Sequence, residues 1–477
     1  MEEGHVLDDK WKILHSSTPR GSSLPPERGM PELERDLIQF FNQIVSVAER
    51  VWKRSPNARL FNSPTRANVS SLPPVPDAQI RLVSPEFEPE SRFATAVPWK
   101  LKSLRSPQES NEKDLIWSCQ DVLRDDPRRR FSYGVTLDGS ELRIWFFSRS
   151  HELVTPPLNC LTETSRLIHL LLALTFASPE ELGYDETMTQ FIDDSDAVQY
   201  KIQVGTAVYI TTKLLSDHRN NAVCGRTTRV WEAYREDDPE RAPVALKDLW
   251  TSTGAIQEGD QLLDLHEKLK TLEDSATPHP PGQYFLTVLN HGFVQTSSGE
   301  DDHTVDIMTR GCSPPIGGDS RARKHYRIVF KEVGTPVHNL ERLSDVMRAL
   351  ADATQALRIL YRLGLVHRDV SAGNILLVDG IGKLSDLEYL KSFKGPSSHL
   401  DERIIGTAEY TSGEAAARIF CYIPQICNDI DTSNDDIDIF DAPVPPPFRF
   451  VPSMMSNPRC GLGSGLFYIM DETRVKR

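Results

Sequence analysis

Three polar residues of the chain, Asp369, Asn374 and Asp386, stand at the spacing that phosphoryl transfer requires. They belong to the segment LVHRDVSAGNILLVDGIGKLSD. The carboxylate of an HRD motif can lie beside an acceptor hydroxyl, while an asparagine further along the loop reaches a metal ion. The second aspartate, after a short hairpin, can meet Mg²⁺ that bridges the phosphates. Because this reaction leaves little covalent work to the protein, these groups supply most of what it needs.

The chemistry of the three side chains suits different roles. Asp369 is the candidate base or hydroxyl-orienting group. Asn374 and Asp386 offer hard oxygen ligands, which Mg²⁺ prefers together with phosphate oxygens and water. The alternative is a surface loop between two strands, because Asp and Asn are common turn residues. We favour the catalytic interpretation, since the flanking apolar runs fit a hairpin only if the polar residues share one rim.

Regular elements are predicted on both sides of this motif. Apolar residues recur at helical spacing over residues 343–361, and Gly364 follows as a stop signal. Two short apolar segments then flank the turn dipeptide Asp379-Gly380, which predicts a hairpin that delivers Asp386. The apolar positions of the helix are Leu343, Val346, Met347, Leu350, Ala353, Leu357, Leu360 and Tyr361.

Through VHRDVSAGNILL, GKLSDLEYLK, VFKEVG and VALKDLW, the chain closely resembles the fungal-type protein kinase family over residues 112–414. This family is a divergent branch of the protein kinase superfamily. The resemblance implies an α+β, two-lobed protein-kinase-like fold, here with an N-terminal extension and an incomplete C-terminal lobe. It also implies ATP and Mg²⁺ as co-substrate and metal, and transfer of phosphate to a protein hydroxyl.

The resemblance also assigns roles to Lys247 and Glu258. Lys247 lies in the alternating, β-favouring run VALKDLW and matches the strand lysine that contacts the nucleotide phosphates. Its partner is expected on the following helix, where Glu258 fits best and Glu267 is the alternative. Taken alone, such a lysine is usually only a solvated charge, so its assignment depends on its order before the catalytic loop.

Two further segments are expected to contact nucleotide. The phosphate-covering loop of the family is a shortened GRxT turn, matched here by Gly225, Arg226 and Thr227, and its backbone amides could cradle phosphate. A single glycine is a weak signal that also fits an ordinary hairpin. The segment FKEVG resembles the hinge that binds adenine through backbone groups, so contacts are expected near Glu332 and Val333.

Two departures from the usual kinase pattern bear on function. Asp386-Leu387-Glu388 keeps the metal ligand of Asp-Phe-Gly but loses the glycine that permits unusual backbone angles, which predicts restricted motion of the following segment. Ser371 stands where serine/threonine kinases generally carry lysine, so the acceptor stays open. We rank serine or threonine ahead of tyrosine, and a small-molecule phosphotransferase is a third hypothesis.

The family pattern is lost after Glu414. Thr407 and Thr411 match the end of the activation segment by position, but residues 421–458 are acidic and then proline-rich, which predicts a solvated or disordered tail. A complete helical lobe needs several further amphipathic helices, and no convincing set follows. An unsupported loop could leave catalysis impaired. The alternative to an active kinase is therefore a pseudokinase or interaction scaffold.

Composition indicates a protein of two to three domains with no membrane span or secretory signal, which makes the cytoplasm or nucleus the default location. A net charge of −14 argues against binding to nucleic acid or anionic lipid. The seven cysteines form no Cys-x-x-Cys pair, which argues against a structural metal. We expect a protein substrate, and no nucleic-acid, membrane or structural-metal partner. The basic cluster Arg128-Arg129-Arg130 is interpreted as a solvated turn.

The order of segments predicts six regions. An amphipathic helix is expected over residues 32–52, a hairpin around Asp138-Gly139 and a buried helix over residues 163–176. The regions are 1–53, an N-terminal helix region; 54–110, a Pro/Ser-rich linker; 111–200, a pre-kinase α/β region; 201–334, the kinase N-lobe and hinge; 335–420, a partial kinase C-lobe; and 421–477, an acidic, Pro-rich tail.

Overall fold

The structure, a computed structural model, is a mixed α+β fold, as predicted. It describes residues 30–62, 76–83, 94–102, 108–218, 227–272, 277–304 and 322–392. The chain forms two compact units. The first comprises the described residues within Met1–Pro239, Lys247–Thr253 and Phe293–Arg327, and the second those within Glu240–Leu246, Gly254–Gly292 and Ile328–Arg477.

The first unit contains a seven-stranded sheet in the order β1-β2-β3-β4-β5-β6, with β7 paired to β5. Strands β3 and β4 are parallel, whereas the other pairs are antiparallel. A parallel pair needs a crossover connection, and α3 (Gln108–Asp125) lies between these two strands in the chain. The strands are β1 (Ala58–Asn62), β2 (Ala78–Leu82), β3 (Thr95–Lys102), β4 (Phe131–Asp138), β5 (Glu141–Ser148), β6 (Glu152–Val154) and β7 (Leu158–Asn159).

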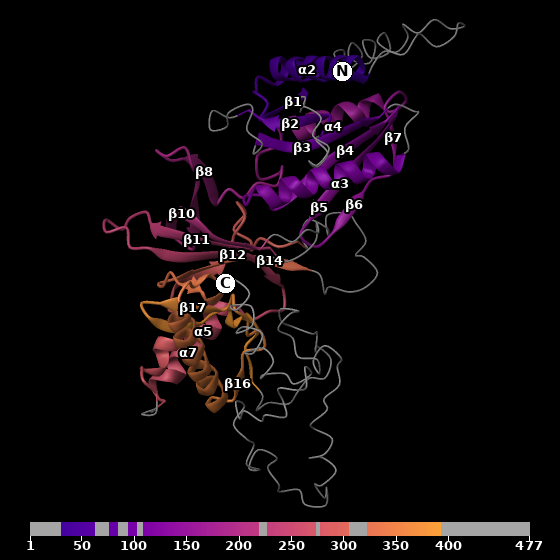
Figure 1. The fold of residues 1–477 in the computed structure, drawn as a ribbon. Coiled ribbons are helices and arrows are strands. Elements are labelled where there is room, and N and C mark those ends of the chain that lie inside the picture. The colour runs from indigo at the N-terminus through magenta and orange to yellow at the C-terminus, as the bar shows by residue number, and fades with distance from the viewer. Residues whose placement is uncertain are drawn as a thin grey trace, which may run out of the picture. The chain divides into compact units, whose positions relative to one another are not determined.

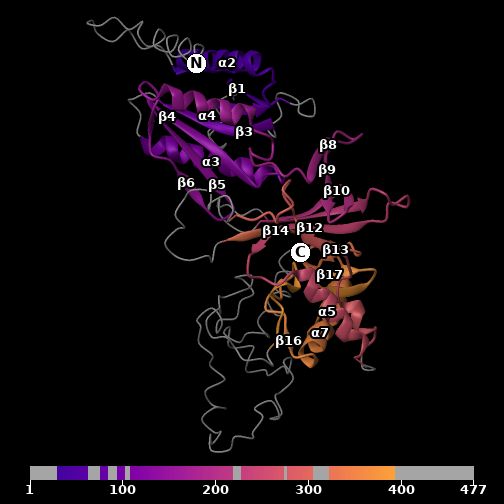
Figure 2. The same ribbon diagram turned by 180° about the vertical axis from the view of Figure 1, so that it is seen from behind.

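Helices cover both faces of this sheet (Figures 1 and 2). Helices α2 (Met30–Trp52) and α4 (Thr164–Phe176) pack apolar residues into a core around Trp99. Helix α3 packs Leu115 against Phe147 in a separate core. Each large apolar side chain buried in this way contributes about 1.5–3 kcal/mol to stability. Both α2 and α4 were predicted from their apolar spacing, and the hairpin around Asp138-Gly139 is the β4–β5 pair.

The prediction of a linker over residues 54–110 is wrong for the stretches that form β1, β2 and β3. Leu60, Ile80 and Trp99, one from each strand, are almost completely buried. Most of the proline and serine of this region stands between the strands in the sequence. Composition averaged over a long window therefore hid three short strands, each of which needs only a few residues.

The interpretation of Arg128, Arg129 and Arg130 as a solvated turn is also wrong, because all three are buried. The Arg129 guanidinium lies 4.2 Å from the ring centre of Tyr184, a cation–π contact. Arg130 Nη2 donates to Asp302 Oδ1 at 2.8 Å. A buried charge needs such partners. Asp302 stands 172 residues further along the chain, so no local pattern could reveal this pairing.

A second seven-stranded sheet has the order β13-β14-β12-β11-β10-β9-β8. Its strand β12 (Val244–Ser252) carries Lys247, and every residue of this strand except the last is buried. Both faces of β12 are therefore covered. The other strands are β8 (Met188–Ile192), β9 (Val198–Val204), β10 (Ala207–His218), β11 (Thr228–Arg235), β13 (Val288–Phe293) and β14 (Arg323–Phe330).

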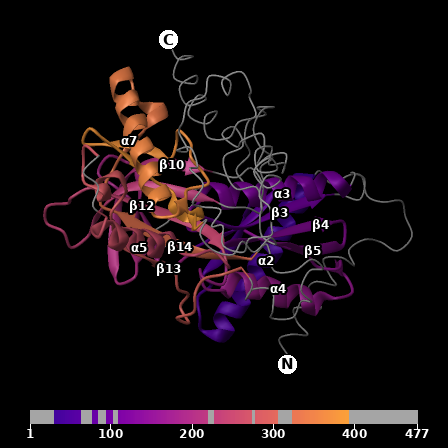
Figure 3. The ribbon, with the colours of Figure 1, turned by 90° about the horizontal axis from the view of Figure 1, so that it is seen from below.

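The second unit contains α5 (Glu258–Lys270) and α7 (Leu343–Arg362), both labelled in Figure 3. Helix α7 is the helix predicted before the motif, and it contacts the hairpin of β17 (Ile375–Val378) and β18 (Ile381–Leu384). The hairpin turn, Asp379-Gly380, has φ of +48° and +79°, as a type I′ turn requires. Shorter elements are η2 (Pro281–Tyr284), β15 (Thr335–Pro336), η3 (Val337–Asn339), β16 (Leu365–Val366), η4 (Leu387–Tyr389) and β19 (Lys391–Ser392).

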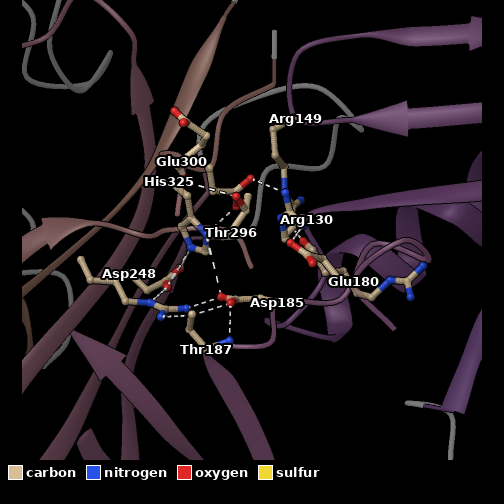
Figure 4. Close-up of polar contacts among 12 residues, drawn as sticks. Arg130, Arg149, Glu180, Asp185, Thr187, Asp248, Thr296, Glu300 and His325 are labelled. Carbon is tan, nitrogen blue, oxygen red and sulfur yellow. Dashed lines mark hydrogen bonds and ion pairs between the residues drawn. The ribbon is translucent and has the colours of Figure 1, made fainter. Parts of the chain in front are cut away.

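Six buried charged residues of the first unit contact one another in what we call the buried charge network (Figure 4). His325 lies at its centre, with Nε2 3.0 Å from Asp248 Oδ2 and Nδ1 3.2 Å from Asp302 Oδ2. Because both ring nitrogens face carboxylate oxygens, both must donate, and the imidazole is protonated. Burial alone would lower the pKa of His325, but Asp248 and Asp302 outweigh it and raise the pKa to about 9. The network consists of Arg130, Asp185, Asp248, Asp302, His325 and Arg327.

Arg327 joins the remaining members of the network. Its Nε donates to Asp248 Oδ2 at 2.7 Å, and its Nη2 donates to Asp185. Its Nη1 donates to Thr187 Oγ1 at 2.7 Å and to the Gln203 carbonyl oxygen at 2.9 Å. Burial would raise the pKa of Asp248, but the charges of His325 and Arg327 outweigh it and hold the pKa well below its usual range. Three carboxylates thus balance three cations.

Raising the pH above neutrality is expected to destabilise the first unit through His325. The pKa of this residue rises from 6.5 to about 9 on folding, so its stabilising contribution is complete below pH 6.5 and is lost as the pH rises through 9. For one group, the free energy of unfolding falls by at most about 1.4 kcal/mol per pH unit in this window. Urea unfolding between pH 6.5 and 9.5 measures the slope. A His325→Gln variant should lack it, and equal slopes would contradict the prediction.

Candidate active site

The loop after β16 carries Asp369 and Asn374, and both side chains are partly exposed. Asn374 Nδ2 donates to the backbone carbonyl oxygen of Asp369 at 2.9 Å. The Asn374 N–H donates to the Ser371 carbonyl oxygen at 3.1 Å, which closes the loop between them. Because the loop holds the amide nitrogen, the amide oxygen is the atom of this side chain that can ligate a cation.

Ser385 connects this loop to Asp386. Its N–H donates to the Asn374 carbonyl oxygen at 2.9 Å, and its Oγ donates to the same oxygen at 3.1 Å. The strands beside it pair Ile375 with Leu384. Since Ser385 immediately precedes Asp386, these bonds hold the two predicted metal ligands at the same end of the β17–β18 hairpin. The sequence spacing therefore brings together two of the residues that we predicted to act together.

Two residues of the candidate site have left-handed backbone conformations without being glycine. Arg368, in the HRD motif, has a φ of +74°, and Asp386 has a φ of +60°. Such conformations cost on the order of 1–3 kcal/mol each and cluster at functional sites, where the surroundings impose them. Arg368 directly precedes the predicted base Asp369, and Asp386 is itself a predicted metal ligand. Asp386 adopts the unusual angle itself, although the glycine of Asp-Phe-Gly is absent.

His367 is buried and holds the loop to the strand that precedes Asp386. Its Nε2 donates to the Ser385 carbonyl oxygen at 2.9 Å, and its Nδ1 accepts from the Asp369 N–H at 3.3 Å. One ring nitrogen donates and the other accepts, so the imidazole is neutral. Burial lowers the pKa of His367, which agrees with this tautomer. A protonated ring would lose the bond to Asp369.

Glu258, the first residue of α5, contacts the turn that follows Asp386. Its Oε1 accepts from the Leu387 N–H at 3.2 Å. One turn further along the helix, Gln261 Nε2 donates to the Glu388 carbonyl oxygen at 3.2 Å. Leu387 is fully buried. Helix α5 is thus tied to the Asp386-Leu387-Glu388 turn by side chain to backbone bonds, a connection that the sequence did not predict.

The predicted nucleotide contacts are only partly described. Lys247 lies buried in β12 and belongs to the first unit, whereas Glu258 belongs to the second, so their pairing stays a prediction. Thr227 is buried, and its carbonyl oxygen accepts from the Trp250 N–H at 3.3 Å. Gly225 and Arg226 lie outside the described residues, as do Thr407, Thr411, Glu414 and the predicted tail.

The predicted hinge follows β14, and the Glu332 side chain is engaged there. Its Oε2 accepts from the Thr287 N–H at 2.8 Å, its Oε1 accepts from Thr287 Oγ1 at 2.9 Å, and Lys383 Nζ lies 3.3 Å from Oε1. Lys383 also donates to the Phe285 carbonyl oxygen at 2.8 Å. The Glu332 carboxylate therefore stabilises the hinge from within. Nucleotide contacts at Glu332 and Val333 stay a prediction that concerns backbone groups.

The fungal protein kinase family matches residues 85–418, well over half of the 477 residues. The chain belongs to the fungal protein kinase family. The resemblance that its motifs indicated is confirmed; the match ends close to the predicted limit of residue 414 but begins at residue 85, before the predicted limit of residue 112. The protein has a kinase-like fold of the mixed α+β class.

Two other proteins are similar over smaller parts. The serine/threonine-protein kinase drp72 of Corynebacterium efficiens is 37% identical over 73 residues, which cover 15% of this chain and 14% of that protein. A crystal structure of a kinase domain is 14% identical, with a TM-score of 0.28, and the match covers 45% of this chain and 59% of that one. The matched part of this chain thus spans less than two thirds of the length of either protein.

The side chains of the candidate site fit Mg²⁺. Asn374 and Asp386 provide an amide oxygen and a carboxylate, both partly exposed at one end of the hairpin, and these are ligand types that the ion prefers. Two protein ligands are also the number expected of an ion that takes its remaining ligands from phosphate and water.

Among the helices of the described residues, none has the length and apolar character needed to cross a membrane.

Replacing Gly382 of β18 by alanine is expected to destabilise this kinase. A Cβ there would lie 2.6 Å from the Ala349 carbonyl oxygen and 2.8 Å from Asp352 Cβ, against the body of α7. Helix α7 would have to shift to make room for the added Cβ, so we expect the free energy of unfolding to fall by about 1–3 kcal/mol. Gly373→Ala is the matched control, because its nearest atom would be Ser371 Oγ at 3.7 Å. Thermal unfolding of both variants checks the difference, and equal melting temperatures would contradict it.

Proposed function

We propose that the protein is an ATP- and Mg²⁺-dependent protein kinase that transfers the γ-phosphate to a serine or threonine of a protein substrate. The observation that carries this proposal is the connection of Asn374 to both Asp369 and Ser385. These bonds join the loop of Asp369 and Asn374 to the residue that precedes Asp386, which supports a shared role for the base candidate and the two metal-ligand candidates. Family membership supports the same reaction class.

Each residue has a separate part in the proposed reaction. The Asp369 carboxylate orients the acceptor hydroxyl and takes its proton as the hydroxyl oxygen bonds to the γ-phosphorus, while the bond from that phosphorus to the β,γ-bridging oxygen breaks and ADP leaves. Asn374 and Asp386 would hold Mg²⁺, which neutralises charge on the phosphates. Lys247 contacts the phosphates, Glu258 orients the lysine, and backbone groups at Glu332 and Val333 hold adenine. The turn at Gly225, Arg226 and Thr227 covers the phosphates.

The acceptor is the less constrained part of the proposal. Ser371 is buried, and its position is the one at which serine/threonine kinases generally carry lysine. The similar protein from Corynebacterium efficiens is named as a serine/threonine-protein kinase, which supports that acceptor class. We propose a cytoplasmic or nuclear location, because the sequence contains no apolar segment of membrane-spanning length.

One observation favours an impaired pseudokinase or scaffold instead. The Glu258 carboxylate, proposed to orient Lys247, accepts from the Leu387 N–H. A kinase needs its strand lysine and helix glutamate in place. If this bond competes with the lysine, the protein would bind nucleotide but transfer phosphate slowly.

The test combines nucleotide binding with phosphate transfer. ATP is titrated by calorimetry with and without Mg²⁺, and γ-labelled ATP is then incubated with a mixture of Ser-, Thr- and Tyr-containing peptides. The proposal expects tighter binding with Mg²⁺ and label in phosphoserine or phosphothreonine. Binding without transfer would establish the scaffold alternative, and label in phosphotyrosine would overturn the acceptor class.

A further inference from the structure

Asp248 links the buried charge network to the lysine proposed to contact phosphate, because it directly follows Lys247 in β12. Successive side chains of a strand point to opposite faces of the sheet. Asp248 and Trp250 therefore share one face of the sheet. On that face Asp248 contacts His325 and Arg327. The rings of Trp250 and His325 stack there, with their centres 4.6 Å apart. Lys247 points to the opposite face.

The network reaches well beyond the second sheet. Arg130 and Asp185 precede that sheet in the chain, yet Arg130 pairs with Asp302 and Asp185 pairs with Arg327 (Figure 4). Arg130 Nη1 also lies 3.6 Å from Glu180 Oε1. The Asp185 N–H donates to the Arg128 carbonyl oxygen at 2.7 Å, so side chain and backbone hold this segment together. Residues before the second sheet are thereby attached to β12 and β14.

We propose that Asp248 is a positioning residue, which holds β12 to the segment of Arg130 and Asp185 and thereby fixes the backbone that presents Lys247. Two features of the contacts support this role. Asp248 accepts from both His325 and Arg327, so rotation of its side chain is restricted from two directions. Charged donors and acceptors form the shorter, stronger hydrogen bonds, and burial removes the water that would weaken them.

The inference rests on the proposed function of Lys247, but the attachment of β12 can be measured without catalysis. The variant is Asp248→Asn, which keeps the shape and removes the charge. Thr187→Val is a milder second variant, because it removes one neutral acceptor of Arg327 and one hydroxyl donor to Asp185 and leaves every charge in place. Glu236→Gln is the control, since Glu236 pairs with Lys201 at 2.7 Å on the exposed surface of the same sheet.

Three quantities are measured on the full chain: amide hydrogen exchange of the peptide covering residues 244–252, the KM for Mg·ATP, and the KM for the peptide acceptor. For Asp248→Asn we expect exchange faster by about tenfold and an ATP KM raised by about tenfold, with the acceptor KM unchanged. A purely structural role would lower the active fraction and leave both KM values as they are. Thr187→Val should change exchange and ATP KM in the same direction by a few-fold.

The outcomes distinguish a failure of the positioning role of Asp248 from a failure of the proposed function. Wild-type exchange in both variants would overturn the positioning role, whatever the activity. Faster exchange with an unchanged ATP KM would also overturn it, because β12 would have loosened without effect on nucleotide. If wild-type protein binds no ATP, the proposed function fails, and exchange alone decides whether Asp248 holds β12. If Asp248→Asn does not fold, Thr187→Val decides by the same measurements.

Discussion

Substituting Asp369 by asparagine is expected to lower kcat by about 10²–10⁴-fold and to leave the KM for Mg·ATP near its wild-type value. The substitution keeps the size of the side chain and removes the group that takes the proton of the acceptor hydroxyl. The backbone contacts of this residue, to His367 Nδ1 and Asn374 Nδ2, do not involve the carboxylate. Steady-state transfer of labelled phosphate to peptide measures kcat.

Asp379→Asn is the matched control for this substitution. Asp379 is an exposed residue of the β17–β18 turn with a φ of +48°, and asparagine tolerates that conformation. We expect the control to keep both kcat and stability. A similar kcat for the two variants and wild type would show that Asp369 is not the base, and with intact Mg·ATP binding it would favour the scaffold alternative.

Replacing Arg327 by methionine is expected to cost about 3–5 kcal/mol of unfolding free energy. Arg327 is almost completely buried, and its guanidinium neutralises Asp185 and Asp248 together. Methionine fills similar space but leaves the three buried carboxylates of the network facing only two cations, in a medium that solvates charge poorly. The loss should be smaller at pH 4 than at pH 7, because protonation of the carboxylates relieves the unmatched charge.

Lys201→Met is the comparison for Arg327→Met. Lys201 pairs with Glu236 at 2.7 Å, and both side chains are more than two-fifths exposed. Exposed pairs contribute about 0–1 kcal/mol, so this loss should be small. Urea unfolding at pH 7 compares the two variants. Equal losses, or a cost for Arg327→Met below about 1 kcal/mol, would mean that the network contributes little to stability.

Local patterns predicted the elements that carry the site. Helix α7, the β17–β18 hairpin and the β4–β5 hairpin followed from apolar spacing and turn dipeptides, because those signals depend on neighbours in the sequence. The exposed fractions of Leu343 and Met347, 59% and 45%, show the limit of the helical pattern. Both were assigned to the apolar set of α7, whereas the buried face of the helix also includes Ala349, Ala356 and Ile359, which that set left out.

The candidate catalytic and metal-binding residues could be found from the sequence, but the residues that hold them in place could not. Asp369, Asn374 and Asp386 have residue types and spacing that phosphoryl transfer requires. The residues that hold them, His367 and Ser385, act through backbone hydrogen bonds, and serine in particular has no distinctive pattern. His367 belongs to the HRD motif, but the sequence indicated no role for it. Partners far apart in sequence, such as Arg130 and Asp302, could only be found in three dimensions.

The buried charge network also limits where the chain can be truncated without loss of folding. A shortened version that starts at residue 201, the predicted beginning of the N-lobe, would lose Arg130, Asp185 and Thr187 while keeping Arg327 and His325. In that fragment Arg327 would lose the Asp185 carboxylate and the Thr187 hydroxyl and keep Asp248, and Asp302 would lose Arg130. Recombinant fragments for crystallisation or inhibitor screening therefore need to retain Arg130, Asp185 and Thr187, together with the first sheet, whose strands β1 to β5 share one core.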